Sequence, residues 1–173
     1  LGAKEHFAEA YRAKSPLSKV PALQLDDGRF LSESRAICTY LEGLYPEPNL
    51  MGVDATERAF IEMADRRAEL YLLAGIANTV RHTHPGLAPL EQPQFPEFGQ
   101  AQAAKVREVA AWFDTVLQQQ PWIAGDRFTI ADITAFCAIE FARLMRFQPG
   151  REGMVALQAW RDRMADRPSA AVR

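Results

Sequence analysis

The stretch Lys19-Val20-Pro21-Ala22-Leu23, followed after a turn by Ser32-Glu33-Ser34-Arg35-Ala36-Ile37, decides the fold of this chain. Proline cannot donate to a sheet ladder, so a strand that begins at Pro21 lies at a sheet edge or a bend. An X-Pro bond is also readily cis, and cis proline is typical of a specific turn. The backbone of Val20 is therefore expected to face outward near a helix start, where N–H groups lack intrahelical partners. This arrangement predicts a receptor for a small peptide-like zwitterion.

Val20-Pro21-Ala22-Leu23, the hairpin turned by Asp26-Asp27-Gly28, and Glu33-Ser34-Arg35-Ala36-Ile37 resemble the glutathione-binding half-site of the bacterial-type cytosolic glutathione transferase family. The resemblance implies that the backbone of Val20, set by Pro21, binds the cysteinyl part of glutathione as an added strand would.

Three further roles follow from the same resemblance. It implies that Ser34 and the first amides of its helix hold the γ-glutamyl carboxylate. It also implies that Glu33 meets the γ-glutamyl ammonium, and that Lys19 reaches the glycyl carboxylate or the cysteinyl backbone.

Taken without the family, the same residues have structural interpretations. Ser32 or Ser34 is then an N-cap, and Glu33 is an acid of the first helical turn. Pro21 is then an edge-strand proline. The order of the pieces favours the ligand site, because a proline-led strand, a tight hairpin, Glu-Ser and an amphipathic helix follow one another directly.

Composition limits the remaining possibilities. A chain of 173 residues with 48% hydrophobic and 24% charged residues is typical of a globular protein of one or two domains. The net charge of −2 gives no nucleic-acid footprint, and no apolar run is long enough for a membrane span. Cys38 and Cys137 lie in apolar contexts without metal-ligand spacing, so we expect both to be reduced and buried in a cytoplasmic protein.

The resemblance implies an α+β thioredoxin-like N-terminal domain, followed by an all-α glutathione transferase C-terminal domain. We expect residues 1–45 to be the later part of the first domain, residues 46–54 a linker, and residues 55–173 the helical domain. A lone hairpin is not stable, so either further strands precede Leu1 or the hairpin rests only on helices. The resemblance favours the first and implies that the first βαβ unit of the thioredoxin-like domain lies upstream of Leu1 in a longer product.

Apolar periodicity predicts helices at residues 34–45, 55–82, 100–120, 129–144 and 153–166, with a proline-rich loop at 85–98. Thr129 and Asp132 have the spacing of a capping box, and Phe128 and Ile133 that of a hydrophobic staple. The helix that they open is apolar almost all round, as in a buried central helix. We therefore interpret Thr129 and Asp132 as structural; the motif also resembles the one that starts the core helix of the family's α domain.

The resemblance also locates the chemistry. Family members activate the glutathione thiol with a Ser, Tyr or Cys near the end of the first strand, a segment expected upstream of Leu1, so the catalytic residue and the subclass stay open. The electrophile site is implied at Arg81, His82, His84 and Phe141. His82 and His84 are two apart and would face different sides of a helix, which argues against a metal site. Arg66 and Arg67 could reach the glutathione of a partner, or they are surface charges or intersubunit ion pairs.

The predicted function is that of a detoxifying, homodimeric glutathione S-transferase, which joins the glutathione thiolate to a hydrophobic electrophilic small molecule. A glutathione-dependent isomerase or disulfide reductase is the first alternative. A non-catalytic binding or assembly protein of the same fold is the second. The identity of the electrophile is left open by the sequence, because the residues that line such sites vary independently of the fold.

Overall fold

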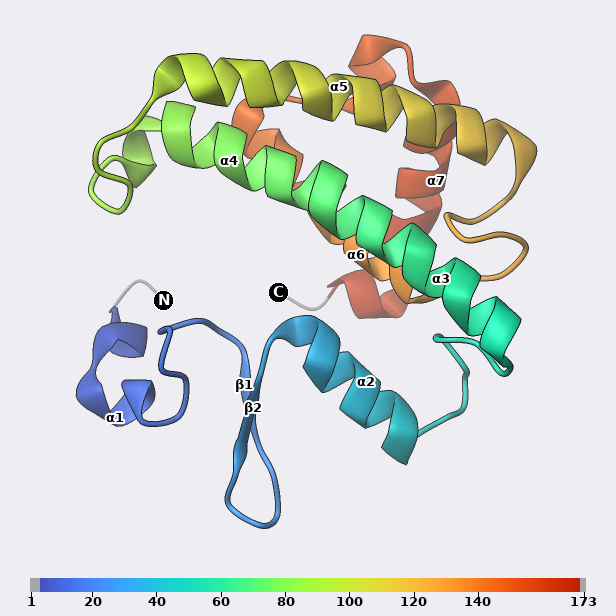
Figure 1. Cartoon of the computed structure of the whole chain (residues 1–173). Helices are drawn as coiled ribbons and strands as arrows, with labels where there is room; N and C mark the ends of the chain where they lie inside the picture. Colours follow the sequence, from blue (N-terminus) through green and yellow to red (C-terminus); the bar gives the residue numbers. More distant parts are fainter. Residues whose placement is uncertain (1–3, 172–173) are drawn as a thin grey trace. The chain divides into compact units, whose positions relative to one another are not determined.

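The computed structural model describes residues 4–171, which divide into two compact units, Leu1–Leu50 and Met51–Arg173 (Figure 1). The first unit is a hairpin with helices before and after it. Its elements are a 3₁₀ turn Glu5–Phe7, α1 (Glu9–Arg12), β1 (Ala22–Gln24), β2 (Phe30–Ser32) and α2 (Ser34–Leu44).

The hairpin is antiparallel, and Leu23 pairs with Leu31 at its centre. The N–H of Leu25 donates to the C=O of Arg29 at 2.8 Å, which closes the ladder beside the turn. Gly28 takes φ +85°, a conformation that a residue with a Cβ rarely adopts. The Asp26-Asp27-Gly28 sequence therefore forms the turn that its composition indicates.

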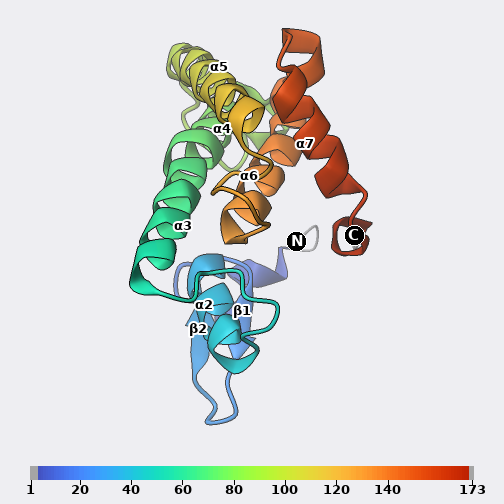
Figure 2. The same cartoon turned by 90° about the vertical axis from the view of Figure 1, so that its right-hand side faces the viewer.

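As far as residue 171, where the description ends, the helical unit contains five α-helices and several short 3₁₀ and π segments. Its elements are α3 (Ala55–Arg67), a π-helical segment Ala68–Leu73, α4 (Ala74–Thr83), 3₁₀ Pro85–Leu87, α5 (Pro96–Gln119), α6 (Ile130–Phe141), 3₁₀ Ala142–Met145, 3₁₀ Pro149–Glu152, α7 (Val155–Ala165) and 3₁₀ Pro168–Ala171. Within this unit, α6 lies between the α3–α4 helix and α7, as Figures 1 and 2 show.

The predicted helix at residues 55–82 is one continuous helix in which a π-helical segment separates α3 from α4. Arg67 and Leu73, at the two junctions, both have right-handed helical φ and ψ. Gly75 lets α4 approach α5 closely, since a Cβ at this position would lie 2.8 Å from Cγ2 of Val106. The buried stripe that this helix contributes to the core is Ala64, Ala68, Leu72, Ile76 and Val80.

The core of the helical unit is completed from α5, α6, α7 and the segments around them. Trp160, Phe113 and Phe147 are its largest fully buried side chains. Asp114 on α5 is also buried, and its Oδ1 accepts the Leu157 N–H at 2.8 Å, so that α5 satisfies a backbone donor in the first turn of α7.

Several sequence expectations are wrong in detail. Helix α5 begins at Pro96 and not at residue 100, because proline fits the first helical turn, where its missing N–H has no partner to lose. The last helix begins at Val155, two residues later than expected. Neither cysteine is buried as expected: Cys38 on α2 is only partly buried, and Cys137 is exposed on α6. Helix α6 therefore has an uncovered face, although its sequence is apolar almost all round.

Candidate functional site

The Val20–Pro21 peptide bond is cis, and β1 begins at the next residue, Ala22. Val20 is 46% exposed. Within residues 4–171 its N–H donates no hydrogen bond and its C=O accepts none. The chain therefore presents an exposed residue with unpaired backbone groups just before the strand, as the sequence led us to expect.

The hairpin register relates Val20 to the start of α2. Ala22 is paired with Ser32, the last residue of β2. Continued by one and two positions, an antiparallel register places Pro21 opposite Glu33 and Val20 opposite Ser34. Figure 1 shows α2 following β2 directly at this end of the hairpin. The fold thus brings the three predicted elements of the half-site to one end of the hairpin.

Glu33 is the N-cap of α2, and its backbone has φ +68° and ψ +114°. Its side chain makes no capping hydrogen bond, and both Glu33 and Ser34 are exposed. Two of the structural alternatives are therefore wrong: neither serine is the N-cap, and Glu33 is not in the first turn. The edge-strand alternative for Pro21 is compatible with its place directly before β1. The first intrahelical bond runs from the Ile37 N–H to the Glu33 C=O at 3.0 Å, so the N–H groups before Ile37 form an anion-attracting helix start.

Lys19 is an exposed residue, but both its backbone N–H and its backbone C=O form hydrogen bonds. The Ser15 hydroxyl donates to the Lys19 C=O at 2.9 Å and accepts the Lys19 N–H at 3.2 Å. The Tyr11 hydroxyl donates to the same carbonyl at 2.8 Å. Sequence reasoning missed Tyr11 and Ser15, because contacts from side chain to backbone across a loop leave no periodic signal.

The predicted electrophile contacts Arg81 and His82 lie in the last turn of α4. Nδ1 of His82 accepts the Phe95 N–H at 3.2 Å, and its ring meets Phe98 edge-on with centroids 5.1 Å apart. The Gln94 side-chain amide donates to the Arg81 C=O. The end of α4 therefore anchors the loop that leads into α5.

Two other residues of this prediction have packing roles. Nδ1 of His84 accepts the Gly86 N–H at 3.1 Å and so caps the 3₁₀ turn after α4. Phe141 ends α6 and packs, partly buried, against the core of the helical unit. Among residues 4–171 no group of three or more His, Cys, Asp or Glu side chains could hold a metal ion.

Thr129 and Asp132 form the capping box of α6. Oδ2 of Asp132 accepts the Thr129 N–H at 2.9 Å, while Oδ1 accepts the Ile123 N–H at 2.9 Å and the Trp160 Nε1–H at 3.0 Å. Burial raises the pKa of Asp132, and these hydrogen bonds oppose part of that effect. The carboxylate joins the preceding loop, α6 and α7, which gives it a structural role.

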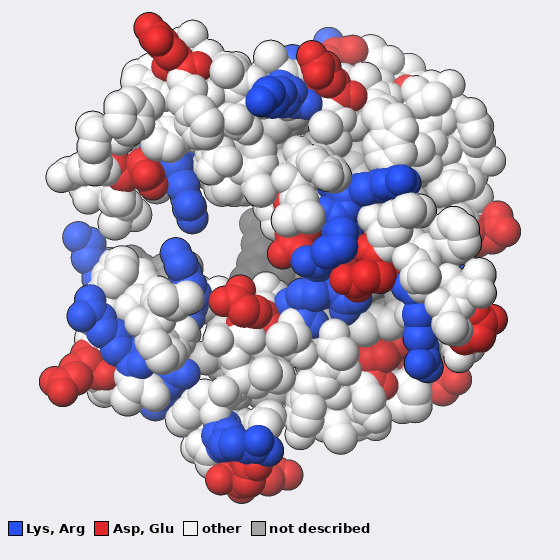
Figure 3. All heavy atoms as spheres, in the orientation of Figure 1, with Lys and Arg blue, Asp and Glu red and all other residues white. Residues whose placement is uncertain are grey.

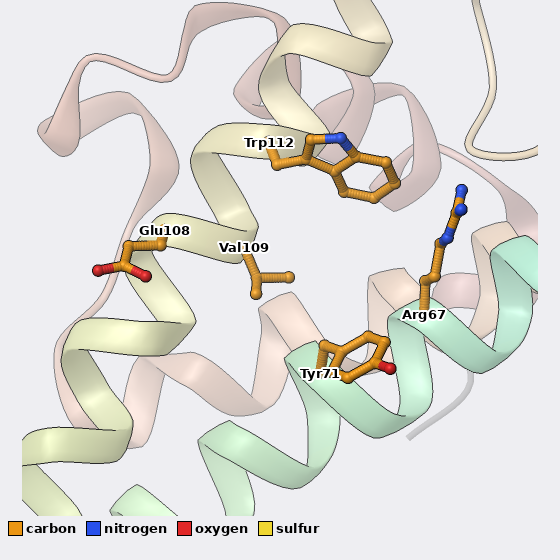
Figure 4. A pocket seen from close by; sticks show the side chains of 5 residues that line it. All are labelled: Arg67, Tyr71, Glu108, Val109 and Trp112. Carbon is orange, nitrogen blue, oxygen red and sulfur yellow. The ribbon is translucent and has the colours of Figure 1, made fainter.

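A hollow of ≈ 380 Å³ lies on the helical unit between the α3–α4 helix and α5 (Figure 4). Its lining residues are Arg67, Tyr71, Glu108, Val109 and Trp112. The Arg67 guanidinium carbon lies 5.4 Å from the centre of the Trp112 ring, which is within cation–π range. Arg66, its neighbour, is instead engaged by Glu62, Asp65 and Glu69 on its own helix.

Comparison with known proteins identifies the class. The model of the glutathione S-transferase N-terminal domain matches residues 2–49, and that of the C-terminal domain matches residues 72–168. Glutathione S-transferase 2 of Saccharomyces cerevisiae is 40% identical over 166 residues, which cover 95% of this chain and 71% of that protein. The crystal structure of Gtt2 from the same yeast superposes with a TM-score of 0.89 at 39% identity, covering 97% of this chain and 81% of that one.

Other relatives carry different activities in their names. The maleylacetoacetate isomerase of Pseudomonas aeruginosa is 33% identical over 158 residues, which cover 90% of this chain and 68% of that protein. Elongation factor 1-gamma of Schizosaccharomyces pombe is 32% identical over 144 residues, but these cover only 32% of that protein and 79% of this chain.

The fold is that of a glutathione-dependent transferase, with a thioredoxin-like N-terminal part that holds a small sheet and a helical C-terminal domain. The chain belongs to the glutathione S-transferase family, whose co-substrate is glutathione. The predicted fold class, enzyme class and co-substrate are thereby confirmed at the level of the family. In residues 4–171 no helix is both long and apolar enough to cross a membrane.

Proposed function

We propose that this protein conjugates the thiolate of glutathione to an electrophilic small molecule. The observation that carries the proposal is that Val20, an exposed residue whose N–H and C=O are unpaired within residues 4–171, lies opposite the start of α2 in a chain of this family. Glu33 and Ser34 at that helix start are both exposed. We further propose a cytoplasmic location and a homodimer.

The half-site matches the charges of glutathione group by group. The γ-glutamyl carboxylate is assigned to the Ser34 hydroxyl and the first amides of α2, where the helix dipole favours an anion. The γ-glutamyl ammonium is assigned to the Glu33 carboxylate. The N–H and C=O of Val20 are assigned to the cysteinyl backbone, with Lys19 toward the glycyl end. Within the helical unit, Arg81, His82 and Phe141 are the proposed contacts of the electrophile.

Calorimetry on the full-length protein tests the site. We expect glutathione to bind at millimolar concentration or below, and Ser34→Ala to weaken binding about 10-fold or more, because it removes a hydrogen bond to a charged group. Ser32→Ala, which deletes the same hydroxyl two residues earlier in β2, is the matched control and should bind as the wild type does. Wild-type protein that does not bind glutathione contradicts the enzyme assignment, and unchanged binding by Ser34→Ala contradicts the half-site.

A second candidate function is glutathione-dependent isomerisation, favoured by the similarity to the maleylacetoacetate isomerase of P. aeruginosa. The two reactions differ in what happens to the thiol. Conjugation consumes one glutathione for each product, whereas isomerisation regenerates it. Titration of free thiol during turnover of an aryl halide, and of a diketo acid with a cis double bond, therefore separates conjugation from isomerisation. Formation of oxidised glutathione would instead identify a disulfide reductase. Binding without turnover of any of these substrates would favour a non-catalytic member of the family.

A further inference from the structure

We propose that Tyr11 and Ser15 are positioning residues for glutathione, which aim the backbone N–H of Val20 at the ligand. The inference rests on the proposed function, because it concerns the same half-site. It assigns a binding role to two hydroxyl groups that belong to the segment around α1 and not to the strand or helix that contacts the ligand.

Two hydroxyl groups converge on one carbonyl. Ser15 is 1% exposed, and its hydroxyl uses both its donor and its acceptor capacity on Lys19, at 2.9 Å to the C=O and 3.2 Å to the N–H. Tyr11 adds a second donor to the same C=O at 2.8 Å. The Lys19 carbonyl therefore accepts two hydrogen bonds and is held in one direction.

Peptide planarity carries this constraint to Val20. The Lys19 C=O and the Val20 N–H belong to the same peptide unit, and this bond is not among the cis bonds of the chain. In a planar trans peptide the C=O and the N–H point in opposite directions. Because Tyr11 and Ser15 draw the carbonyl to their side, the N–H of Val20 must point away from them.

Within the described residues, the backbone hydrogen bonds of the surrounding loop lie before Lys19, and none of them involves Val20. Residues 13–21 lie between α1 and β1, and Leu17 in this segment is 73% exposed. The Ser18 N–H donates to the Ser15 C=O at 2.8 Å, which tightens the turn before Lys19. Ser15 thus acts through its backbone and its hydroxyl on the same short loop, and substitution of the hydroxyl should turn the Lys19–Val20 peptide without removing any group that contacts glutathione.

Variants of the full-length protein test the inference through a split between kinetic constants. We expect Tyr11→Phe to raise both the Kd and the KM for glutathione about 3-fold to 10-fold, the range of one neutral hydrogen bond. Ser15→Ala should raise them about 10-fold or more, and Ser15→Thr, which keeps a hydroxyl, should restore most of the affinity. For each of these variants, kcat at saturating glutathione and the KM for the electrophile should stay at the wild-type values.

The control is Tyr45→Phe, which removes a phenolic hydroxyl from a side chain that is 70% exposed and should change neither constant. Adding Ser34→Ala to the Ser15→Ala variant should weaken glutathione binding further. Ser15→Ala leaves the start of α2 intact, so Ser34 still contributes to binding in that variant. If wild-type protein binds glutathione and Tyr11→Phe binds equally well, the positioning role is wrong while the proposed function stands. If the wild type itself does not bind, the proposed function fails first. Should Ser15→Ala not fold, Tyr11→Phe decides the question.

Discussion

At the scale of single residues, Glu33 is the most constrained position of the half-site. A non-glycine residue with φ +68° and ψ +114° is uncommon and unfavourable by about 1–3 kcal/mol. Its carboxylate is exposed and does not cap α2, so helix formation does not explain the conformation. Such a backbone is typical of ligand sites, which supports the assignment of Glu33 to the ammonium of glutathione.

We therefore expect Glu33→Gln to raise the Kd for glutathione about 10-fold, since a charge-assisted hydrogen bond becomes a neutral one. The matched ligand is a glutathione analogue without the γ-glutamyl amino group. Because this analogue has no ammonium for Glu33 to meet, calorimetry should give the same Kd for wild type and variant. A loss of affinity for the analogue as large as the loss for glutathione would show that Glu33 acts on the fold of the half-site instead.

Asp132 links three parts of the helical unit: the loop before α6, α6 itself and α7. Its buried carboxylate accepts hydrogen bonds from the backbone of Ile123 and Thr129 and from the Trp160 indole. Asp132→Ala leaves these buried donors without an acceptor, and we expect the free energy of unfolding to fall by about 3 kcal/mol or more in urea titrations. Asp126→Ala, an exposed acid in the same loop, should change it by less than about 0.5 kcal/mol. Equal effects of the two substitutions would contradict the structural role.

The binding residues proposed from the sequence belong to a contiguous motif with distinctive chemistry: a proline, a Glu-Ser pair and a helix start. Val20, Glu33 and Ser34 could be proposed from the sequence for that reason, and their binding role stays a prediction. Tyr11 and Ser15 could not, because their function depends on which way one loop carbonyl points. The positive φ of Glu33 was equally hidden, since nothing in a glutamate indicates a left-handed backbone.

At the scale of elements, the start of α3 is stabilised by a network that the sequence reasoning overlooked. Asp54 is the N-cap and accepts the Glu57 N–H at 2.9 Å, while Glu57 accepts the Val53 N–H at 2.8 Å. Arg127 binds the other carboxylate oxygen of Glu57. The backbone hydrogen bond from Val53, followed by the one from Arg127, lowers the pKa of Glu57 below its ordinary value of 4.5.

This shift predicts a pH dependence of stability. The folded-state pKa of Glu57 lies below the unfolded one, so its contribution is complete above the ordinary pKa and is lost as pH falls through the folded value. We expect Glu57→Gln to lower the urea midpoint at neutral pH and to flatten its decline below pH 4.5. Glu97→Gln, an exposed first-turn acid of α5, is the control and should leave the decline unchanged. An equally steep decline in Glu57→Gln would contradict the contribution of this carboxylate.

Helix α6 was predictable because two independent signals indicate the same helix: Thr129 and Asp132 form its capping box, and the apolar run after them enters the core. The π-helical segment Ala68–Leu73 was not, because the apolar pattern continues through it without a break. In α2 the apolar periodicity predicts more burial than the structure has. Ile37 is buried, but Tyr40 and Leu41 are 36% and 40% exposed. Period alone identifies a face of a helix and does not say what covers it.

At the scale of the whole molecule, charge gives little guidance to partners. Lysine and arginine number 20 against 22 aspartate and glutamate residues, and both kinds are interspersed on the face drawn in Figure 3. Apolar exposure is more informative. Along α3 and the π-helical segment, large apolar side chains at helical spacing are 39–61% exposed; they are Phe60, Met63, Leu70 and Tyr71.

Tyr71 of this stripe and the 42% exposed Trp112 on α5 both line the hollow of Figure 4. Exposed apolar patches of this kind mark interaction surfaces, and we propose a second copy of the chain as the occupant. In a two-fold interface each surface meets itself. Arg67 and Glu108 line the same hollow and have opposite charges. Across a two-fold axis, Arg67 of one copy could therefore pair with Glu108 of the other.

Leu70→Asp tests the proposed homodimer. Leu70 is 56% exposed, so the substitution should leave the fold intact while placing a carboxylate in the middle of the apolar stripe. Wild-type protein should sediment as a dimer at micromolar concentration, and Leu70→Asp should raise the dimer Kd about 30-fold or more, the effect of disrupting an interface hot spot. Val155→Asp, a control at the start of α7 with 75% exposure, should remain dimeric. A wild type that sediments as a monomer would contradict dimerisation, while a Leu70→Asp variant as dimeric as the wild type would place the interface elsewhere.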